Sequence, residues 1–202
     1  MADVLSTGSP TLPTAQRILV AARAALLESG FSALSTRSVA LMAGVPLSQI
    51  HYHFGSKEQL ILAMLREENE ALVHRQADMF HLDVSLGDRW RRACDYLDDD
   101  INSGYVRVLQ EMIAAGWSST EVRNSVSELI GSWTAVLSDV VEQARDTGVA
   151  FGPFSAEEVV ALIASVFYGA ESMLLLGLDP DVPVRTALRR IGDLLDVWEP
   201  SG

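Results

Sequence analysis

The chain has 202 residues, enough for one or two domains with a sizeable buried core. Its composition, 49% hydrophobic and 21% charged, is typical of a globular protein and excludes an intrinsically disordered chain. A net charge of −12 excludes a uniformly basic protein, so any nucleic-acid binding requires a local basic region. The single cysteine, Cys94, excludes an intramolecular disulfide. With no secretory signal pattern at the start, we expect a cytoplasmic protein.

The first predicted helix follows a polar N-terminal segment. Residues 1–13 are rich in Ser, Thr, Gly and Pro and are predicted to form a disordered tail. Thr14 is a candidate N-cap for a helix that reaches about Ser29 and ends at Gly30. Apolar residues recur along it at the i, i+3, i+4 spacing of an amphipathic helix: Ile18, Ala21, Ala22, Ala25 and Leu26.

Two short helices are predicted next, separated by a tight turn. Ser35 can cap the first of them. Gly44 tolerates a positive φ and can end that helix tightly. Pro46 suits the first turn of a second helix, which ends at the break after Phe54. Helix, glycine turn and short helix form a helix-turn-helix, whose second helix can enter a DNA major groove.

The second short helix has one apolar and one polar face. Ile50 and Phe54 lie four residues apart on the apolar face. The polar side chains are Ser48, Gln49, His51 and Tyr52. Gln can pair with adenine through two hydrogen bonds, and Ser can contact several base edges. By spacing alone, a solvated helix in an ordinary helical bundle is an equally good interpretation.

Three runs of residues carry a resemblance to a known family. They are Ile18-x2-Ala21-Ala22-x3-Leu26-x3-Gly30-Phe31, Ser35-x3-Val39-Ala40-x2-Ala43-Gly44-Val45 and Ile50-x2-His53-Phe54-x-Ser56-Lys57-x2-Leu60. Over residues 14 to about 62, the chain resembles the DNA-binding domain of the TetR family of transcriptional regulators. It departs from the family at His51, where a tyrosine is usual, and at Leu47-Ser48, where Lys-Gly is frequent. The DNA sequence that a family member recognises can therefore not be assigned to this chain.

The resemblance implies an all-α protein with a three-helix helix-turn-helix domain at residues 14–60 and a larger helical effector-binding and dimerisation domain at 61–202. Phosphate contacts are expected from Thr36, His51 and Lys57, and base contacts from Arg37, Gln49 and the neighbouring Ser48 and Tyr52. The charge distribution permits this interpretation, because residues 14–60 carry a net charge of +2 and residues 61–202 carry −13.

The second part of the chain is predicted to be helical throughout. The expected helices are a continuation from Lys57 past His74, then 86–103, 105–117, 119–147, 155–178 and 182–198. Residues 159–178 are apolar over a length that would span a bilayer. Glu171 lies within this run and acidic residues flank it, so we expect no membrane insertion. It is predicted to be a central helix of the body that also contributes to a dimer interface. The resemblance places that homodimer interface in the last two helices.

The aromatic and methionine residues of the body are either core residues or the lining of a ligand cavity. Core packing is the default interpretation for each of them. If a cavity exists, an apolar or aromatic small-molecule effector is expected, with Arg107, Glu111 or Glu171 as polar groups. The candidate ligand-binding residues are Trp90, Tyr105, Met112, Trp117, Trp133, Phe167, Tyr168 and Glu171.

A few other side chains are of the types that bind metals, undergo redox chemistry or catalyse reactions. His74 and His81 share a helix face but lack further ligand spacing, so no metal site is predicted. Residues 98–100, three aspartates, are expected to be solvated, and Cys94 is expected to be a small core residue. No catalytic motif such as HExxH, GxSxG or a P-loop occurs, and neither an enzyme activity nor a cofactor is predicted.

The sequence thus predicts a homodimeric, sequence-specific DNA-binding regulator that binds a double-stranded operator. A repressor released from a palindromic operator by a small molecule is the favoured mechanism. The alternative is a helical small-molecule-binding or interaction module that has lost DNA binding. The ligand, the operator sequence and the regulated genes have no signature in the sequence.

Overall fold

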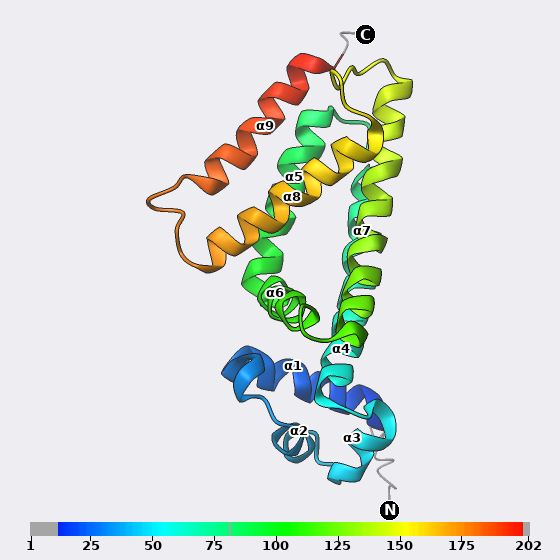
Figure 1. The fold of residues 1–202 in the computed structure, drawn as a ribbon, viewed down its shortest axis with the longest axis vertical. Helices are drawn as coiled ribbons and strands as arrows, with labels where there is room; N and C mark the ends of the chain where they lie inside the picture. Colours follow the sequence, from blue (N-terminus) through cyan, green and yellow to red (C-terminus); the bar gives the residue numbers. More distant parts are fainter. Residues whose placement is uncertain (1–11, 81, 200–202) are drawn as a thin grey trace, which may run out of the picture. The chain divides into compact units, whose positions relative to one another are not determined.

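The structure, a computed structural model, describes residues 12–80 and 82–199. These residues form helices and contain no strand, which confirms the all-α prediction (Figure 1). The helices are α1 (Thr14–Ala33), α2 (Thr36–Ala43), α3 (Leu47–Phe54), α4 (Lys57–Phe80), α5 (Leu86–Ser103), α6 (Tyr105–Gly116), α7 (Thr120–Asp146), α8 (Ala156–Leu175) and α9 (Val184–Trp198). The tail predicted for residues 1–13 lies outside the described residues except at Leu12 and Pro13.

The chain divides into two compact units, Met1–Met64 and Leu65–Gly202, called here the N-terminal and C-terminal units. The boundary lies within α4, so this helix starts in the N-terminal unit and supplies its last sixteen residues to the C-terminal unit.

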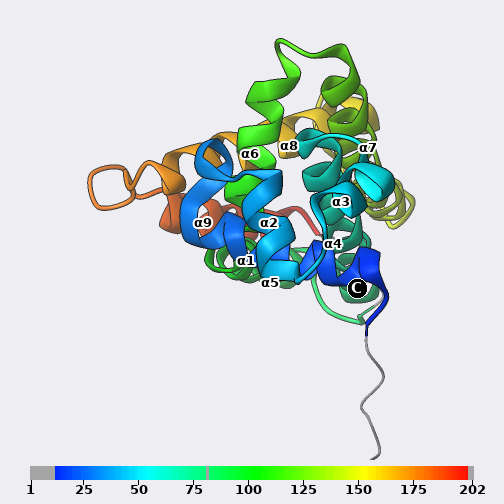
Figure 2. The same ribbon diagram turned by 90° about the horizontal axis from the view of Figure 1, so that it is seen from below.

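The N-terminal unit is a small helical bundle in which α1 contacts both α2 and α3, and α2 contacts α3 (Figure 2). Its fully buried side chains come from every one of its helices. Among them are Ile18 of α1, Val39 of α2, Ile50 of α3, and Leu60, Ile61 and Leu62 of α4. Burial of this apolar set is the main force that fixes helices too short to be stable alone.

The start and end of α1 differ from the prediction. Thr14 is the first helical residue, and Pro13 occupies the N-cap position without a side-chain hydrogen bond. Gly30, with φ 75° and ψ 169°, interrupts the helix where its end was predicted. A last helical turn then continues to Ala33. The prediction of Thr14 as the N-cap is therefore wrong by one residue, because proline fixes the extended entry to the helix.

In the C-terminal unit, the predicted helices are confirmed with ends that shift by at most three residues. Gly104, at φ 84°, forms the break between α5 and α6. α5 packs against α9 and α6, while α7 packs against α6 and α8 (Figure 1). A core cluster joins the end of α4 to α7 and α8 through Met79, Phe80, Leu137, Val141, Ala156, Val159 and Val160.

Ion pairs join α5 to α9, which corrects the prediction of a solvated aspartate face. Asp98 lies 2.7 Å from Nε of Arg185 and 3.2 Å from Nη2 of Arg189. Asp100 lies 2.8 Å from Nη2 of Arg75. Asp99 is exposed as predicted. Successive residues on a helix point in different directions, so the three neighbours meet three different environments.

The long apolar helix α8 is buried on one face only. It is long and apolar enough to cross a membrane, a property that the core helix of a soluble protein can share. Only 33% of its most apolar 18-residue segment is buried within the chain. The predicted central helix is thus buried on one side within the chain, and its contribution to a dimer interface stays a prediction. The exposed side carries large apolar residues, which are Leu162, Val166, Met173 and Leu175.

Cys94 is a core residue, and the histidines that the structure describes are not part of a metal-binding cluster. Cys94 is buried in α5, and burial raises the pKa of its thiol to about 11, so it is a core residue as predicted. His81 lies outside the described residues. Across residues 12–80 and 82–199, no three His, Cys, Asp or Glu side chains are grouped to hold a metal ion.

Candidate nucleic-acid interface and ligand cavity

The turn between α2 and α3 has the geometry of a helix-turn-helix. Ser35 and Ser38 form a capping box at the start of α2, with the backbone N–H of Ser38 3.0 Å from Oγ of Ser35. Gly44 ends α2 in the left-handed conformation, at φ 63° and ψ 41°. Pro46 precedes α3 as its N-cap residue. The predicted capping serine and turn glycine are confirmed, and Pro46 lies one position before the helix instead of inside it.

Arg17 stabilises this turn from α1 and is a residue that the sequence did not reveal. Its Nη2 donates hydrogen bonds to the carbonyl oxygens of Ala43, at 2.7 Å, and Gly44, at 2.9 Å. These carbonyls lie at the C-terminal end of α2, where unpaired acceptors and the negative end of the helix dipole favour a cation. Arg17 therefore fixes the turn that orients α3.

We expect Arg17→Lys to lower the free energy of unfolding by about 1–2 kcal/mol, because a lysine keeps the charge but cannot reproduce the planar guanidinium. Urea denaturation would measure the loss, and hydrogen exchange would locate it in α2 and α3. Arg190→Lys, at an exposed position of α9, is the matched control. Equal stability of the two variants would contradict the role of Arg17 in the turn.

The predicted polar face of α3 is exposed. Ile50 is fully buried, while Ser48, His51 and Tyr52 are exposed and Gln49 is half-buried. Tyr52 leaves 81% of its surface in solvent, although its ring contacts that of His53 edge to face, with ring centres 5.0 Å apart. Thr36 and Arg37, at the start of α2, are half-buried and exposed respectively. The exposed side of the helix-turn-helix thus presents hydrogen-bonding side chains.

Two of the predicted DNA contacts are already bonded within the N-terminal unit. Nζ of Lys57 donates a hydrogen bond of 2.6 Å to the carbonyl oxygen of Phe31 and lies 4.3 Å from the centre of the Phe31 ring. Nδ1 of His51 lies 3.0 Å from the carbonyl oxygen of Gly55. The ammonium of Lys57 has two further protons, so a phosphate contact must be shared with this structural one.

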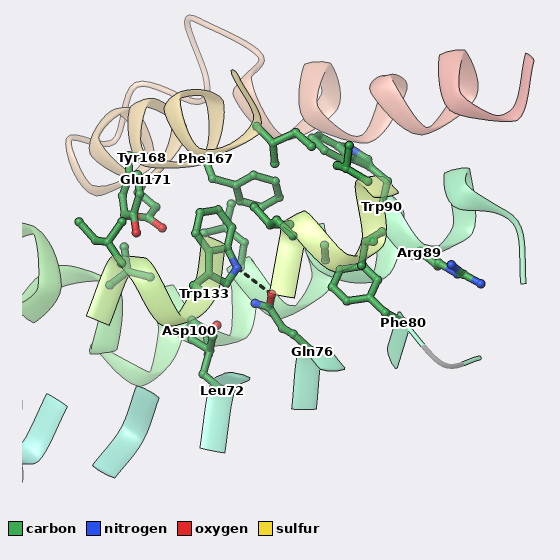
Figure 3. A pocket seen from close by; sticks show the side chains of 18 of the residues that line it. Leu72, Gln76, Phe80, Arg89, Trp90, Asp100, Trp133, Phe167, Tyr168 and Glu171 are labelled. Atoms are coloured by element: carbon green, nitrogen blue, oxygen red, sulfur yellow. Dashed lines mark hydrogen bonds between the residues drawn. The ribbon is translucent and has the colours of Figure 1, made fainter. Parts of the chain in front are cut away.

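The C-terminal unit contains a cavity of about 120 Å³ lined by residues of α4 to α9 and of the loop before α8 (Figure 3). A cavity of this order holds one aromatic ring or a short chain. Most of its wall is apolar. Four aromatic side chains follow one another edge to face, with ring centres 5.3 Å apart for Trp90 and Phe167, 5.8 Å for Phe167 and Trp133, and 5.7 Å for Trp133 and Tyr168.

Residues 18–64 match the family model of the bacterial regulatory proteins of the tetR family. This segment therefore forms a DNA-binding domain of the TetR-family type. The Transposon Tn10 TetC protein of Escherichia coli is 23% identical over 133 residues, which are 64% of this chain and 66% of that relative's length. The family-model match contains the helix-turn-helix and ends with the N-terminal unit.

Solved structures show that the TetR-family fold extends through the C-terminal unit. A TetR transcriptional regulator from Legionella pneumophila is 22% identical, with a TM-score of 0.70 over 92% of this chain and 98% of that one. FadR from Bacillus subtilis, in complex with stearoyl-CoA, is 14% identical, with a TM-score of 0.71 over 89% and 96%. A regulator from Saccharomonospora viridis, in complex with choline, is 20% identical, with a TM-score of 0.70 over 89% and 93%.

Six of the eight candidate ligand-binding residues line the cavity: Trp90, Tyr105, Trp133, Phe167, Tyr168 and Glu171. Met112 is fully buried in α6 but is not part of the wall, and Trp117 is 76% exposed in the loop after α6. Arg107 and Glu111 pair with each other, at 3.3 Å, and also lie outside the wall. Aromatic or charged character does not encode the direction of a side chain. Helix geometry directs Arg107, Glu111 and Met112 away from the cavity, and Trp117 lies beyond the end of α6.

Two polar residues of α4, Asn69 and Gln76, line the same cavity. They were not predicted from the sequence, because neither lies in a local motif. Oη of Tyr105 donates to Oδ1 of Asn69, at 3.1 Å, and Nδ2 of Asn69 donates to Ser132, at 2.7 Å. Nε1 of Trp133 donates to Oε1 of Gln76, at 2.7 Å (Figure 3). A buried Tyr or Trp needs such a partner, which is the one general signal available from sequence.

Glu171 is a buried acidic group of the wall. The residue is 8% exposed, and Oε2 accepts a hydrogen bond of 2.7 Å from Nε2 of Gln110. Burial raises the pKa of Glu171 to about 7, opposed by the hydrogen bond from Gln110 and assisted by the negative charge of Asp100. Burial also raises the pKa values of Tyr105 and Tyr168. The cavity therefore contains a carboxyl group that changes charge near neutral pH.

Proposed function

We propose that this TetR-family chain is a homodimeric, sequence-specific DNA-binding regulator, and that it acts as a cytoplasmic repressor released from its operator by a small molecule. The observation that carries the proposal is the exposed polar face of α3, which follows a glycine turn fixed by Arg17. A helix presented in this way can enter the major groove and donate to or accept from base edges.

The dimer is supported by an exposed apolar surface on two contacting helices, α8 and α9. On α8 it consists of Leu162, Val166, Met173 and Leu175, and on α9 of Leu194, Val197 and Trp198. Several large apolar residues exposed on two helices in contact are a feature of interaction sites. A two-fold dimer would bind a palindromic operator with half-site centres about one helical turn apart, roughly 34–36 Å.

A small-molecule effector is supported by the cavity, and by two TetR-fold structures that were solved with stearoyl-CoA and with choline. The cavity wall includes Asn69, Leu72 and Gln76 of α4, a helix that begins at Lys57 in the N-terminal unit. A ligand that favours one arrangement of α4 would change how well two recognition helices fit successive grooves.

The first test is the affinity of the purified protein for DNA from its own upstream region and for scrambled DNA, each at two salt concentrations. The proposal predicts tight binding by a dimer to the natural sequence and weak, strongly salt-dependent binding to the scrambled one. The alternative, a helical ligand-binding module that has lost DNA binding, predicts equal weak binding to both. A genome-wide selection of bound fragments would then separate a distant operator from a lost activity.

We expect Gln49→Ala to weaken binding to the preferred DNA by about 1–3 kcal/mol and to leave binding to scrambled DNA nearly unchanged. The reason is that an amide side chain reads a base edge, which scrambled DNA presents only by chance. Fluorescence anisotropy with both DNAs would measure the difference. Equal losses on the two DNAs would remove Gln49 from base recognition.

Lys57→Met is the matched phosphate variant, because methionine keeps an unbranched chain against Phe31 but removes the charge. We expect a similar loss on every sequence and a salt slope that is smaller by about one. Since Nζ of Lys57 also bonds to the carbonyl oxygen of Phe31, the unfolding midpoint must be recorded with the affinity. An unchanged salt slope would show that Lys57 is purely structural.

A further inference from the structure

The acidic end of the cavity contains a carboxyl group for which the described residues supply no positive partner. Within the described residues, no Lys, Arg or His pairs with Glu171, and its hydrogen bond comes from the neutral amide of Gln110. Oε1 of Gln110 in turn accepts from Oγ of Ser172, at 3.2 Å, which orients the amide toward Glu171. A buried carboxylate without a cation is costly, so an ionised Glu171 requires a positive group from outside the chain.

The groups that face Glu171 from the surrounding helices are negative or neutral. Asp100 of α5 contributes negative charge, and it is paired with Arg75 of α4. Tyr105 of α6 and Tyr168 of α8 couple to Glu171 electrostatically, and burial keeps both phenols neutral. The electrostatic potential around Glu171 therefore favours binding of a positive charge.

Aromatic rings surround the same end of the cavity. Figure 3 shows Tyr168 beside Glu171, with Trp133 and Phe167 next to them. The one N–H of the Trp133 ring is bonded to Gln76, so the group is satisfied without a ligand and the ring remains as an apolar and π surface. Rings near a carboxylate in a desolvated site are the arrangement that binds ammonium and quaternary ammonium ions.

The arginine of the wall lies at the other end. In Figure 3 the guanidinium of Arg89 points away from the ring cluster. Its Nη2 donates to the carbonyl oxygen of Leu82, at 3.0 Å, and its Nε is buried without a partner. Arg89 thus does not neutralise Glu171. An anionic ligand bound at Arg89 is the alternative that the experiment below would detect.

We infer that the effector of this cavity is a small organic cation, an amine or quaternary ammonium ion, with its charge against Glu171 and among Trp133, Phe167 and Tyr168. The inference rests on the proposed ligand-controlled regulator for its biological meaning. It also makes a prediction for the isolated protein, because cation binding requires no DNA.

Charge selectivity in the unmodified protein is the primary test. Calorimetry would compare choline with 3,3-dimethylbutan-1-ol, and phenyltrimethylammonium with tert-butylbenzene. The two compounds of each pair have the same shape, but the first carries a positive charge and the second is neutral. We expect the cation of at least one pair to bind about tenfold more tightly or better than its neutral partner. Equal affinities, preference for the neutral compounds, or no binding of either cation at millimolar concentration would overturn the inference. Selective binding of a carboxylate such as octanoate would instead identify an anion site at Arg89.

The pH dependence gives an independent readout. Below about pH 7 Glu171 is mostly protonated in the free protein, and cation binding must release that proton. Affinity for a quaternary ammonium ion is therefore expected to rise from pH 6 to pH 8, by up to about tenfold for each unit below the pKa, and to level off above it. The quaternary ion itself does not titrate, so a flat profile would contradict the role of Glu171.

Three variants locate the charge and the rings. Glu171→Gln can still accept from Gln110 and should abolish both the charge preference and the pH dependence. Tyr168→Phe should retain cation binding and Tyr168→Leu should lose about tenfold, because only the first keeps a ring. Trp117→Leu, at an exposed tryptophan outside the cavity, should bind as the unmodified protein does. Cation binding that survives in Glu171→Gln would overturn the inference, whereas cation binding without any effect on operator affinity would leave the site intact and contradict the proposed regulation.

Discussion

A chain that carries Leu162→Glu and Val166→Glu is expected to be a folded monomer with little operator affinity. Both side chains lie on the exposed side of α8, with 48% and 40% of their surfaces in solvent in the single chain. Glutamates there are solvated in a monomer but become buried like charges in a two-fold interface. The folded state should survive, and association should not.

The effect on DNA binding follows from the loss of the second half-site. When two recognition helices are linked, the second binding step is intramolecular, and the link increases affinity by about 10²- to 10⁴-fold. We expect a decrease of this size for the double variant. Light scattering should show a mass near 21.9 kDa for the variant and twice that for the unmodified protein.

The control places the same two charges on a different exposed surface. Ser127→Glu and Ala135→Glu on α7 add equal negative charge, so they reproduce any general repulsion from DNA. They should leave the mass and most of the affinity unchanged. If the α8 variant remained a dimer, the interface would have to lie elsewhere. If the α7 variant lost as much affinity, net charge and not dimerisation would explain the result.

Local signals explain why the helix-turn-helix was predictable. A capping serine followed by an apolar helix, and a glycine at φ 63°, act through residues within four positions of each other. The same holds for Gly104 between α5 and α6, at φ 84°. Where neighbouring residues alone determine the start or end of a helix, a single sequence is enough to predict that helix.

Long-range contacts explain what was missed. The bond from Arg17 to the turn spans 26 residues, and the ion pair of Asp98 with Arg185 spans 87. No local pattern distinguishes such an arginine from a solvated one. The cavity is an intermediate case, because helical period predicts which residues share a face but not whether that face meets the core, the cavity or solvent. Trp133 and Trp117 show the difference, since one lines the cavity and the other is exposed.

The second large effect is expected for Arg75→Met in α4. Nη2 of Arg75 lies 3.0 Å and 2.8 Å from the two carboxylate oxygens of Asp100, and the guanidinium lies 4.2 Å from the centre of the Tyr96 ring. Asp100 is 16% exposed and lines the cavity. Burial already raises its pKa despite the neighbouring arginine. Removing Arg75 would leave a buried carboxylate without its cation.

We expect Arg75→Met to lower the free energy of unfolding by about 2–3 kcal/mol at pH 8, less than for a fully buried pair because Arg75 is partly exposed. The pKa of Asp100 would rise further above that of the unfolded chain, so the folded state would bind the extra proton. The contribution of Asp100 to the stability of the variant should then be greatest at low pH and be lost as pH rises through that pKa, so the deficit relative to the unmodified protein shrinks toward pH 5.

A double-mutant cycle separates the lost pair from lost packing. Arg75→Met with Asp100→Asn should recover most of the deficit at pH 8, because a neutral amide has a much smaller desolvation cost than an unpaired carboxylate. Arg92→Met, at an exposed arginine of α5, controls for loss of one positive charge in an acidic protein. Recovery by the double variant would show that the loss of stability comes from the unpaired charge of Asp100. A deficit that stayed the same at every pH and in the double variant would assign it to the contact between Arg75 and the Tyr96 ring.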